Sequence, residues 1–529
     1  MRSNSFVTID YVIFFAYIAV IIFTGLWVSR SKKKERTSRD YFLADKSLTW
    51  WAIGASLIAA NISAEQMIGM SGSGFAIGLG IASYEWMAAV TLILVGKFFL
   101  PIFIEKKIYT MPQFLEKRYD GRVRTAMAVF WLLVYVFVNL TSVLYLGALA
   151  MNTIMGVPML WGIIGLALFA AVYSIYGGLK SVAWTDVIQV VVLMGGGLIT
   201  VWLALDAVAD GAGPLKGFGL LLEKAPGKFD MILAKDHPHY GDLPGLGVII
   251  GGMWIANISY WGFNQYIIQR GLAAKSVREA QRGVLFAGYL KLIIPLIVVI
   301  PGIAAFVLTQ GDPSIINPPD EAYPWLLHNF VPAGIKGLAF AALTAAIVSS
   351  LASMLNSAST IFTMDIYTNY IVRDADEKRL VRVGRLTSIT ALLLAVLTAR
   401  PLLGGLDQAF QYIQEFTGFV TPGVCAIFLM GFFWKKTSAN AALWSAILTI
   451  PLSFVFKWGW PSLPFIDRMG IVFVLIVLIA VVISFIDNRS QADPKAESIH
   501  KGLFYTDHRF NIGALGILII TAVLYILFW

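Results

Sequence analysis

Apolar runs long enough to cross a membrane recur along the whole chain, and no other feature of the sequence constrains the fold as strongly. A helix of about 20 residues spans the ~30 Å hydrocarbon core of a bilayer, and fourteen such runs can be counted. In the first half they cover residues 9–29, 48–72, 76–104, 123–152, 158–177, 182–207 and 246–268. In the second half they cover residues 284–309, 336–368, 383–400, 405–432, 438–458, 466–486 and 510–528. The pattern predicts an all-α polytopic membrane protein with about 14 transmembrane helices.

The composition agrees with that class and argues against several functions. Hydrophobic residues make up 58% of the chain and charged residues 13%, far from the balance of soluble domains. The sequence contains no G-x-x-x-x-G-K-[ST] nucleotide loop and no H-E-x-x-H zinc motif. Its single cysteine, Cys425, excludes an intramolecular disulfide and a thiolate metal cluster. We therefore expect a protein that is not driven by an ATPase of its own and that is not an enzyme.

The distribution of basic residues predicts how the chain is oriented in the membrane. Most of its 40 Lys and Arg residues fall in loops on one side of the predicted spans, beginning with "RSKKKERTSRD" at 30–40. Because cytoplasmic loops hold the positive excess, that side is expected to be cytoplasmic. An even number of spans then places both termini outside. Topology accounts for the net charge of +9, so we expect no nucleic-acid partner.

Several polar residues interrupt the apolar runs, where they are costly and usually functional. Glu85 and Lys291 lie inside the third and eighth runs. Amide side chains interrupt other runs at Gln66, Asn139, Asn257 and Gln414. The alternative is a structural role, as hydrogen bonds between helices or as an ion pair, and the sequence alone does not place Glu85 and Lys291 in contact.

This polar set suits a neutral solute with many hydroxyl groups. Each amide offers both a donor and an acceptor, and a charged group strengthens the hydrogen bond it joins. An aromatic ring commonly covers the apolar face of a sugar, and Tyr260 and Trp261 follow Asn257 closely. Packing between helices is the alternative role for this aromatic pair.

Two of the runs have a low propensity to form a continuous helix, and both contain the tetrapeptide "ANIS". The second run reads "NISAEQMIGMSGSGFAIGLG" and the seventh reads "GGMWIANISYWGFNQY". Unwound backbone at membrane depth lines a cavity, and its carbonyl groups can coordinate a cation. Ser349 and Ser350 in the ninth run would add hydroxyl oxygens for a hard ion such as Na⁺. A small-residue packing face is the alternative for that run.

Long stretches of the chain resemble the sodium/solute symporter family, and within it the bacterial sodium/galactose and sodium/glucose cotransporters. The stretches that carry the resemblance are "DYFLADKSLTWWAIGASLIAANISAEQMIGMSGSGFAIGLGIASYEW", "VNLTSVLYLG", "VYSIYGGLKSVAWTDVIQV", "WIANISYWGFNQYIIQRGLAAKSV", "AAIVSSLASMLNSASTIFTMDIY" and "QAFQYIQEFTG". The resemblance implies a LeuT-like core of two inverted five-helix repeats, each with a broken first helix. The repeats would cover 48–207 and 246–432, with an extra N-terminal helix at 9–29 and C-terminal helices within 438–528.

The family pattern also implies roles for individual residues. Sugar would be bound by Gln66, Glu85, Asn139, Asn257, Lys291 and Gln414, with Tyr260 stacking on the ring as an inner gate and Trp261 beside it. An outer gate would consist of Met70, Tyr84 and Phe410. Sodium would be held by carbonyl groups of Ala59, Ile62 and Ala346 and by the hydroxyls of Ser349 and Ser350, with Asp186 on its exit route. One position departs from the pattern, because Ala88 stands where the family has a serine that contacts sugar.

The resemblance thus implies sodium-driven import of a neutral hexose, galactose or glucose, across a bacterial inner membrane by alternating access. A rival from the same fold is a symporter for an inositol, a sialic acid, proline or a vitamin. Glu85 would repel an anionic solute unless it is paired with Lys291. A rival from another class is a channel or a sensor that does not pump, and the chain shows no appended signalling domain.

Overall fold

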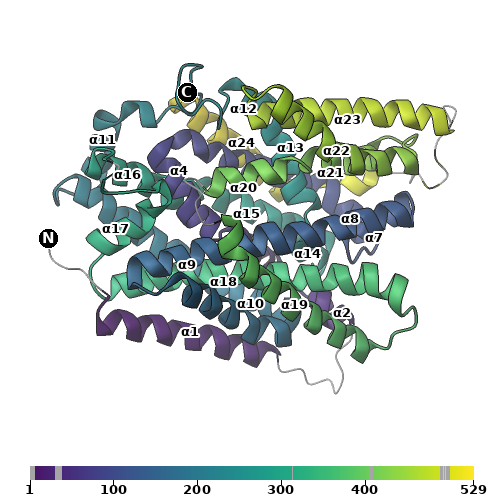
Figure 1. The fold of residues 1–529 in the computed structure, drawn as a ribbon, viewed down its shortest axis with the longest axis horizontal. Helices are drawn as coiled ribbons and strands as arrows, with labels where there is room; N and C mark the ends of the chain where they lie inside the picture. The colour runs from purple at the N-terminus through teal and green to yellow at the C-terminus, as the bar shows by residue number, and fades with distance from the viewer. Residues whose placement is uncertain are drawn as a thin grey trace.

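The computed structural model describes residues 6–29, 38–312, 314–403, 409–488, 493, 495 and 501–529, and its regular elements are helices. In Figure 1 the long helices α1 (Thr8–Ser29), α8 (Gly121–Val134), α18 (Ile335–Ile361) and α23 (Phe465–Asn488) run roughly parallel to one another across the molecule. The prediction of an all-helical polytopic protein is confirmed.

The first half of the chain contains the N-terminal helix α1 and the helices up to residue 208. After α1 come the short helices α2 (Ser38–Leu43) and η1 (Ala44–Lys46), and then the interrupted segment α3 (Trp50–Asn61), η2 (Glu65–Met70) and α4 (Ser71–Ala76). They are followed by η3 (Leu79–Ala82), α5 (Ser83–Leu94), η4 (Val95–Phe99), α6 (Leu100–Glu105), α7 (Met111–Arg118), α8, η5 (Tyr135–Leu140), α9 (Thr141–Met155) and α10 (Met159–Val208). Gly178 has φ 64° and divides α10 into the two predicted spans.

The second half begins after the connecting elements α11 (Pro214–Lys224) and η6 (Pro226–Lys228). Its helices are α12 (Leu246–Ile250), α13 (Gly252–Ile258), η7 (Ser259–Phe263), α14 (Gln265–Leu272), α15 (Val277–Val298), α16 (Ile300–Thr309), η8 (Pro319–Glu321), α17 (Ala322–Phe330), α18, η9 (Phe362–Ile371) and α19 (Glu377–Leu403). The chain ends with α20 (Ala409–Gly418), α21 (Thr421–Phe433), α22 (Ala439–Gly459), α23, η10 (Lys501–Phe504) and α24 (His508–Leu527).

Ten helices of the described chain are individually long and apolar enough to cross a membrane. They coincide with ten of the fourteen predicted spans. The other four predicted spans, 48–72, 158–177, 246–268 and 405–432, coincide with shorter helices: two with the interrupted segments, one with the first part of α10 and one with α20 and α21. In the two interrupted segments, 48–72 and 246–268, the break divides the span into helices that are each too short to cross a membrane.

Both "ANIS" segments lie near a break, but in different ways. Ile62 is extended (φ −75°, ψ 102°) and ends α3 inside the first copy. The second copy is helical, and the break falls later, at Asn264 (φ −80°, ψ 122°), between η7 and α14. Both breaks are flanked by π-helical turns, which are frequent at functional sites.

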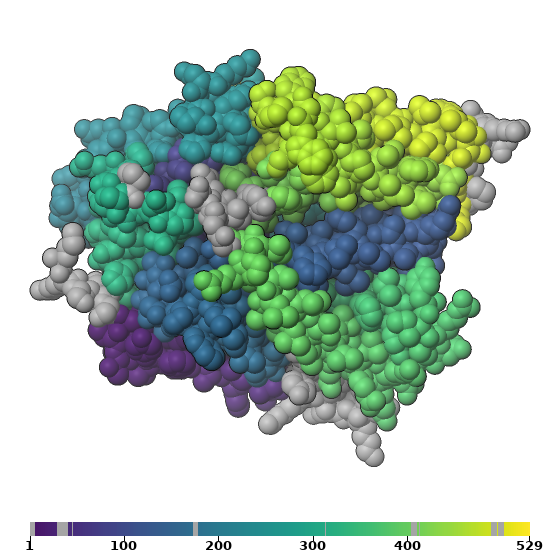
Figure 2. Space-filling view, in the orientation of Figure 1, coloured from purple at the N-terminus to yellow at the C-terminus, as the bar shows by residue number. Residues whose placement is uncertain are grey.

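Helix α18 lies in the interior and packs along α10, with α1 against both of them (Figure 1). Its Ala- and Ser-rich sequence lets these backbones approach closely. Large apolar side chains remain exposed on the outer helices, as at Phe23 of α1 and Ile486 of α23, where they suit a lipid environment. In Figure 2 α22 and α23 (yellow) form the upper right of the visible face, and α1 (purple) the lower left.

Candidate functional site

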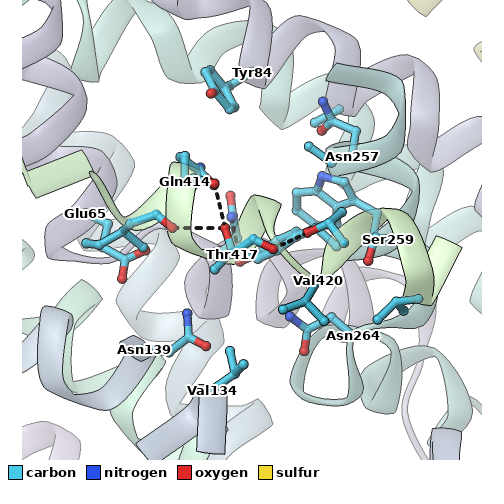
Figure 3. A pocket seen from close by; sticks show the side chains of 18 of the residues that line it. Glu65, Tyr84, Val134, Asn139, Asn257, Ser259, Asn264, Gln414, Thr417 and Val420 are labelled. Carbon is cyan, nitrogen blue, oxygen red and sulfur yellow. Dashed lines mark hydrogen bonds between the residues drawn. The ribbon is translucent and has the colours of Figure 1, made fainter. Parts of the chain in front are cut away.

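A cavity of about 120 Å³ lies between the two interrupted segments, and both halves of the chain line it (Figure 3). A single water molecule needs roughly 10–15 Å³ on this measure, so the space holds a small polar solute. Its walls come from α3, η2, α5, α8, η5, α13, η7, α15, α20, α21 and α23.

All eight residues predicted to bind sugar line this one cavity. They come from seven different helices: Gln66, Glu85, Asn139, Asn257, Tyr260, Trp261, Lys291 and Gln414. Ala88, the position that departs from the family pattern, also lines it. The structure therefore brings together side chains that the sequence spreads over about 350 residues. Their role in binding remains a prediction.

Glu85 and Lys291 form an ion pair within the cavity wall. Their side chains are 4% and 1% exposed. The Lys291 ammonium also donates to the Asn61 side-chain oxygen and lies 5.0 Å from the centre of the Trp261 ring. The ion pair that the sequence analysis considered as a structural alternative is therefore present, and it forms part of the wall of the candidate site. Because the two charges cancel, Glu85 does not act as an isolated negative charge toward a solute.

Tyr260 joins the two interrupted segments. Its hydroxyl oxygen accepts a hydrogen bond from Asn61 Nδ2 at 2.9 Å, and it also bonds the hydroxyl of Tyr266. Its ring meets Trp261 edge to face, with centroids 5.2 Å apart. Asn61 is the last residue of α3. A movement of the backbone at the first break would therefore also move Tyr260 in the aromatic wall of the cavity.

Several of the cavity amides, among them Gln66, Asn257 and Asn139, keep polar groups that no hydrogen bond within the described chain uses. Gln66 accepts from the amide and hydroxyl of Ser63 at 3.1 and 3.0 Å, which leaves its Nε2 donor. Asn257 donates to the Met253 carbonyl at 3.1 Å, which leaves its Oδ1 acceptor. The Oδ1 atom of Asn139 is buried without a partner in the described part of the molecule. A solute that fills these positions must offer both hydroxyl donors and acceptors.

The sequence analysis missed three amide or carboxyl side chains of the cavity wall, Asn61, Glu65 and Asn264, as well as the hydroxyl residues Ser259, Thr417 and Thr421. Glu65 accepts a hydrogen bond from the Ser142 hydroxyl, and Asn264 accepts one from the Tyr135 hydroxyl at 2.5 Å. Asn61, Glu65 and Asn264 all lie at or beside a break. A search for polar side chains next to the expected breaks would have identified these three.

The three residues predicted as an outer gate are buried. The rings of Tyr84 and Phe410 meet edge to face at 5.3 Å, and both line the cavity. Met70 is also buried but does not line it. A Cβ atom on Gly69 would lie 2.8 Å from that of Phe410, so η2 and α20 are in direct contact here.

The residues predicted to bind sodium gather where α18 crosses the first break. Ser350 donates to the Ala60 carbonyl at 2.9 Å. The Ser63 amide donates to Gln66 and not to the Ala59 carbonyl, its usual partner in a helix. Ile62 lies in the extended break, whereas Ala346 lies within continuous α18. Carbonyl and hydroxyl oxygens of this kind suit a hard monovalent cation.

Asp186 lies beside this cluster, completely buried in α10. It accepts from Ser349 at 2.5 Å and from Ser56, and it lies 3.5 Å from the Arg270 guanidinium. Arg270 also donates to Ser353 and to the Tyr266 carbonyl. The predicted exit-route acid is therefore paired with a cation of α14 in this conformation, and its role on the ion's route remains a prediction.

The chain matches known proteins over most of its length. The sodium:solute symporter family model matches residues 41–449. A sodium/glucose cotransporter from Vibrio parahaemolyticus is 56% identical over 98% of both chains. The human sodium/myo-inositol cotransporter 2 is 35% identical over 84% of this chain and 69% of its own.

Among solved structures, a Na⁺-coupled sialic acid symporter in a substrate-bound outward-open state superposes with a TM-score of 0.82 and 25% identity. The match covers 94% of this chain and 100% of the other. Mhp1, a nucleobase-cation-symport-1 family transporter, matches with a TM-score of 0.54 at 13% identity over 90% and 99% of the two chains, and shows the fold alone. The protein has the LeuT-like transporter fold. It belongs to the sodium:solute symporter family, and sodium is its coupling ion.

Proposed function

We propose that the protein moves Na⁺ and a neutral hexose, galactose or glucose, together across the membrane by alternating access. The observation that carries the proposal is the cavity itself: amides with unused donors and acceptors, a neutralised Glu85–Lys291 pair and an aromatic wall lie beside the predicted sodium oxygens. The cotransporter of Vibrio parahaemolyticus, 56% identical, is a sodium/glucose cotransporter, which supports a hexose as the solute.

The proposed sites are those that the family pattern implied. Sugar binds to Gln66, Asn139, Asn257, Gln414 and the Glu85–Lys291 pair, against Tyr260 and Trp261. Sodium binds between Ser349, Ser350 and the carbonyl groups of Ala59, Ile62 and Ala346. Repeats at 48–207 and 246–432 then move relative to one another around the two sites.

Asn61 supplies a physical link between the two ligands. Its backbone ends α3 next to the predicted sodium oxygens, and its side chain contacts both Lys291 and Tyr260. A sodium ion that orders the first break also fixes Asn61, so the sugar site loses less conformational entropy when it binds. By linkage, sugar then strengthens sodium binding by the same factor.

A membrane orientation completes the proposal. We place the chain in a bacterial inner membrane with both termini outside, because most of its basic residues fall in loops of the opposite side. Import of sugar would then follow the inward electrochemical gradient of sodium.

Uptake into proteoliposomes tests this function. Labelled galactose and glucose are supplied with and without an inward sodium gradient, with inositol, sialic acid and proline as competitors. We expect saturable galactose or glucose uptake that collapses when the sodium gradient is removed. Uptake that ignores sodium would contradict symport, and preferential inhibition by another solute would contradict the hexose assignment.

The myo-inositol cotransporter at 35% identity makes inositol the nearest alternative solute. An inositol presents hydroxyl groups to the same amides but lacks a ring oxygen. The competition arm of the uptake experiment separates the two, because the preferred solute inhibits at the lower concentration.

A further inference from the structure

The cavity wall contains more negative than positive charge. Among the described residues that line it, the charged side chains are Glu65, Glu85 and Lys291. Lys291 pairs with Glu85, and both side chains are almost fully buried. The pair therefore contributes no net charge, and Glu85 does not repel anions as an unpaired carboxylate would.

Glu65 lacks such a counter-charge. In the part of the chain that the structure describes, no Lys, Arg or His forms an ion pair with it, and its carboxylate accepts from the Ser142 hydroxyl. That hydroxyl also bonds the Asn139 carbonyl at 2.9 Å, which fixes its position. A hydroxyl donor stabilises a carboxylate but does not cancel its charge.

The position of Glu65 exposes this charge to a bound solute. It begins η2 directly after the first break, next to Gln66, and is half-buried where most of its neighbours are buried. In Figure 3 its side chain lies at one end of the cavity, across from Asn257. Helices with many apolar side chains surround the cavity, so like charges within it repel more strongly than in bulk water.

The fold by itself does not exclude an anionic solute. A symporter that superposes on this chain with a TM-score of 0.82 is a sialic acid symporter, and sialic acid is a sugar acid with a negative charge. Discrimination between neutral and anionic sugars must therefore come from side chains of the cavity.

We propose that Glu65 is a specificity-determining residue that restricts the cavity to uncharged hexoses and excludes sugar acids. This inference rests on the proposed function, because it concerns the charge class of the same solute. It deepens that function by assigning the exclusion to one unpaired carboxylate.

The test compares galacturonate with its methyl ester, which has nearly the same shape without the charge. Each compound is added as an inhibitor of sodium-driven uptake of labelled galactose in proteoliposomes that contain the full chain. For the wild-type protein we expect the inhibition constant of galacturonate to exceed that of the ester by at least about tenfold, equivalent to ~1.4 kcal/mol. In Glu65→Gln we expect the ratio to fall to about threefold or less, even if galactose uptake itself is slower.

Two matched variants separate charge from shape. Glu65→Asp keeps the carboxylate and should keep most of the discrimination. Ser142→Ala removes the hydroxyl partner of Glu65 but leaves the charge of the carboxylate, so this variant should also keep the discrimination. For a variant with slow uptake, thermal stabilisation of the purified protein in NaCl by the two compounds gives the same ratio.

The outcomes of this test are distinct. If the wild type discriminates and Glu65→Gln discriminates equally, Glu65 is not the determinant. If the wild type treats galacturonate and its ester alike, the exclusion itself is wrong while hexose transport stands. If the wild type neither transports nor binds galactose or glucose, the hexose assignment is overturned and this inference with it.

Discussion

At the residue scale, the cavity side chains form some hydrogen bonds and ion pairs with one another. The donors and acceptors that stay without a partner determine which hydrogen-bonding groups a solute must supply. The Glu85–Lys291 pair is electrically neutral, but the amides of Gln66, Asn139 and Asn257 keep unused groups. A buried polar group without a partner costs about 1–3 kcal/mol. A polyhydroxylated solute would remove that cost at several positions together.

Substitution of Ser350 tests the sodium site. Ser350→Ala removes one oxygen next to the Ala60 carbonyl, so we expect the sodium concentration for half-maximal uptake to rise about tenfold, as for a loss of ~1.4 kcal/mol. Thr344→Val is the matched control, because its buried hydroxyl on the same helix has no partner within the described chain. An unchanged sodium dependence of Ser350→Ala would remove this residue from the ion site.

The Glu85–Lys291 pair makes a second residue-scale prediction. Lys291→Met leaves the Glu85 charge uncompensated, which costs about 3–5 kcal/mol for a buried pair. The double variant with Glu85→Gln removes both charges and should recover most of that stability without recovering sugar uptake. Thermal unfolding of the purified proteins measures the first effect and proteoliposome uptake the second. Equal stability of the single and double variants would contradict the buried pair.

The sequence identified these residues but not their contacts. Glu85 and Lys291 are 206 residues apart, and hydropathy carries no information about which faces of two distant helices meet. The predicted sugar residues were found because a charge or an amide at membrane depth is conspicuous. Glu65 was missed because it lies beside Gln66 in a stretch that already contains several polar residues, where a further acidic residue does not stand out as a site residue.

At the element scale, the two breaks show what local sequence does and does not predict. The first falls at Ile62, inside "ANIS", where polar and glycine residues make a poor helix. The second "ANIS" is helical, and there the Asn257 side chain donates to the Met253 carbonyl one turn earlier. The break falls at Asn264 instead, whose side chain accepts from Tyr135 of a distant helix. Its location thus depends on a tertiary contact.

The contact between α4 and α16 makes a prediction for these elements. A Cβ atom on Gly302 would lie 1.9 Å from the Ser71 carbonyl oxygen, so Gly302→Ala must push the two backbones apart. We expect a loss of about 1–3 kcal/mol or more in stability and slower transport, because α4 continues the first broken segment. The measurement is the thermal unfolding midpoint in detergent.

Gly219 of α11 provides the control for that substitution. A Cβ atom added to Gly219 would meet no neighbouring side chain or helix within 4 Å, so Gly219→Ala should stabilise the helix by about 0.5–1 kcal/mol. If Gly302→Ala were as stable as Gly219→Ala, the close approach of α4 and α16 would be wrong.

At the scale of the whole molecule, hydropathy predicts the order of the long apolar helices, because a bilayer imposes a similar length on each span, and ten of the fourteen predicted spans coincide with such helices. It predicts the fold only through the resemblance to known symporters. The Ala and Ser content of α18 allows its close packing against α10 and α1, but the sequence pattern is equally compatible with other neighbours. The exact arrangement needs the contacts between helices that lie far apart in the chain.

The final prediction concerns charge movement by the whole transporter. The hexose is neutral, and the ion pairs Glu85–Lys291 and Asp186–Arg270 remain with the protein, so each cycle should carry the charge of its sodium ions. One charge moved through 100 mV supplies ~2.3 kcal/mol, which corresponds to about fifty-fold accumulation for one ion per sugar. Proteoliposomes with equal sodium on both sides and an inside-negative potassium diffusion potential should therefore accumulate galactose. Without the potential the sugar should only equilibrate, and replacing sodium by choline should abolish uptake. If galactose only equilibrates even when the potential is present, the cycle moves no net charge, another charge must accompany the ion, and the neutral solute would then have to be abandoned.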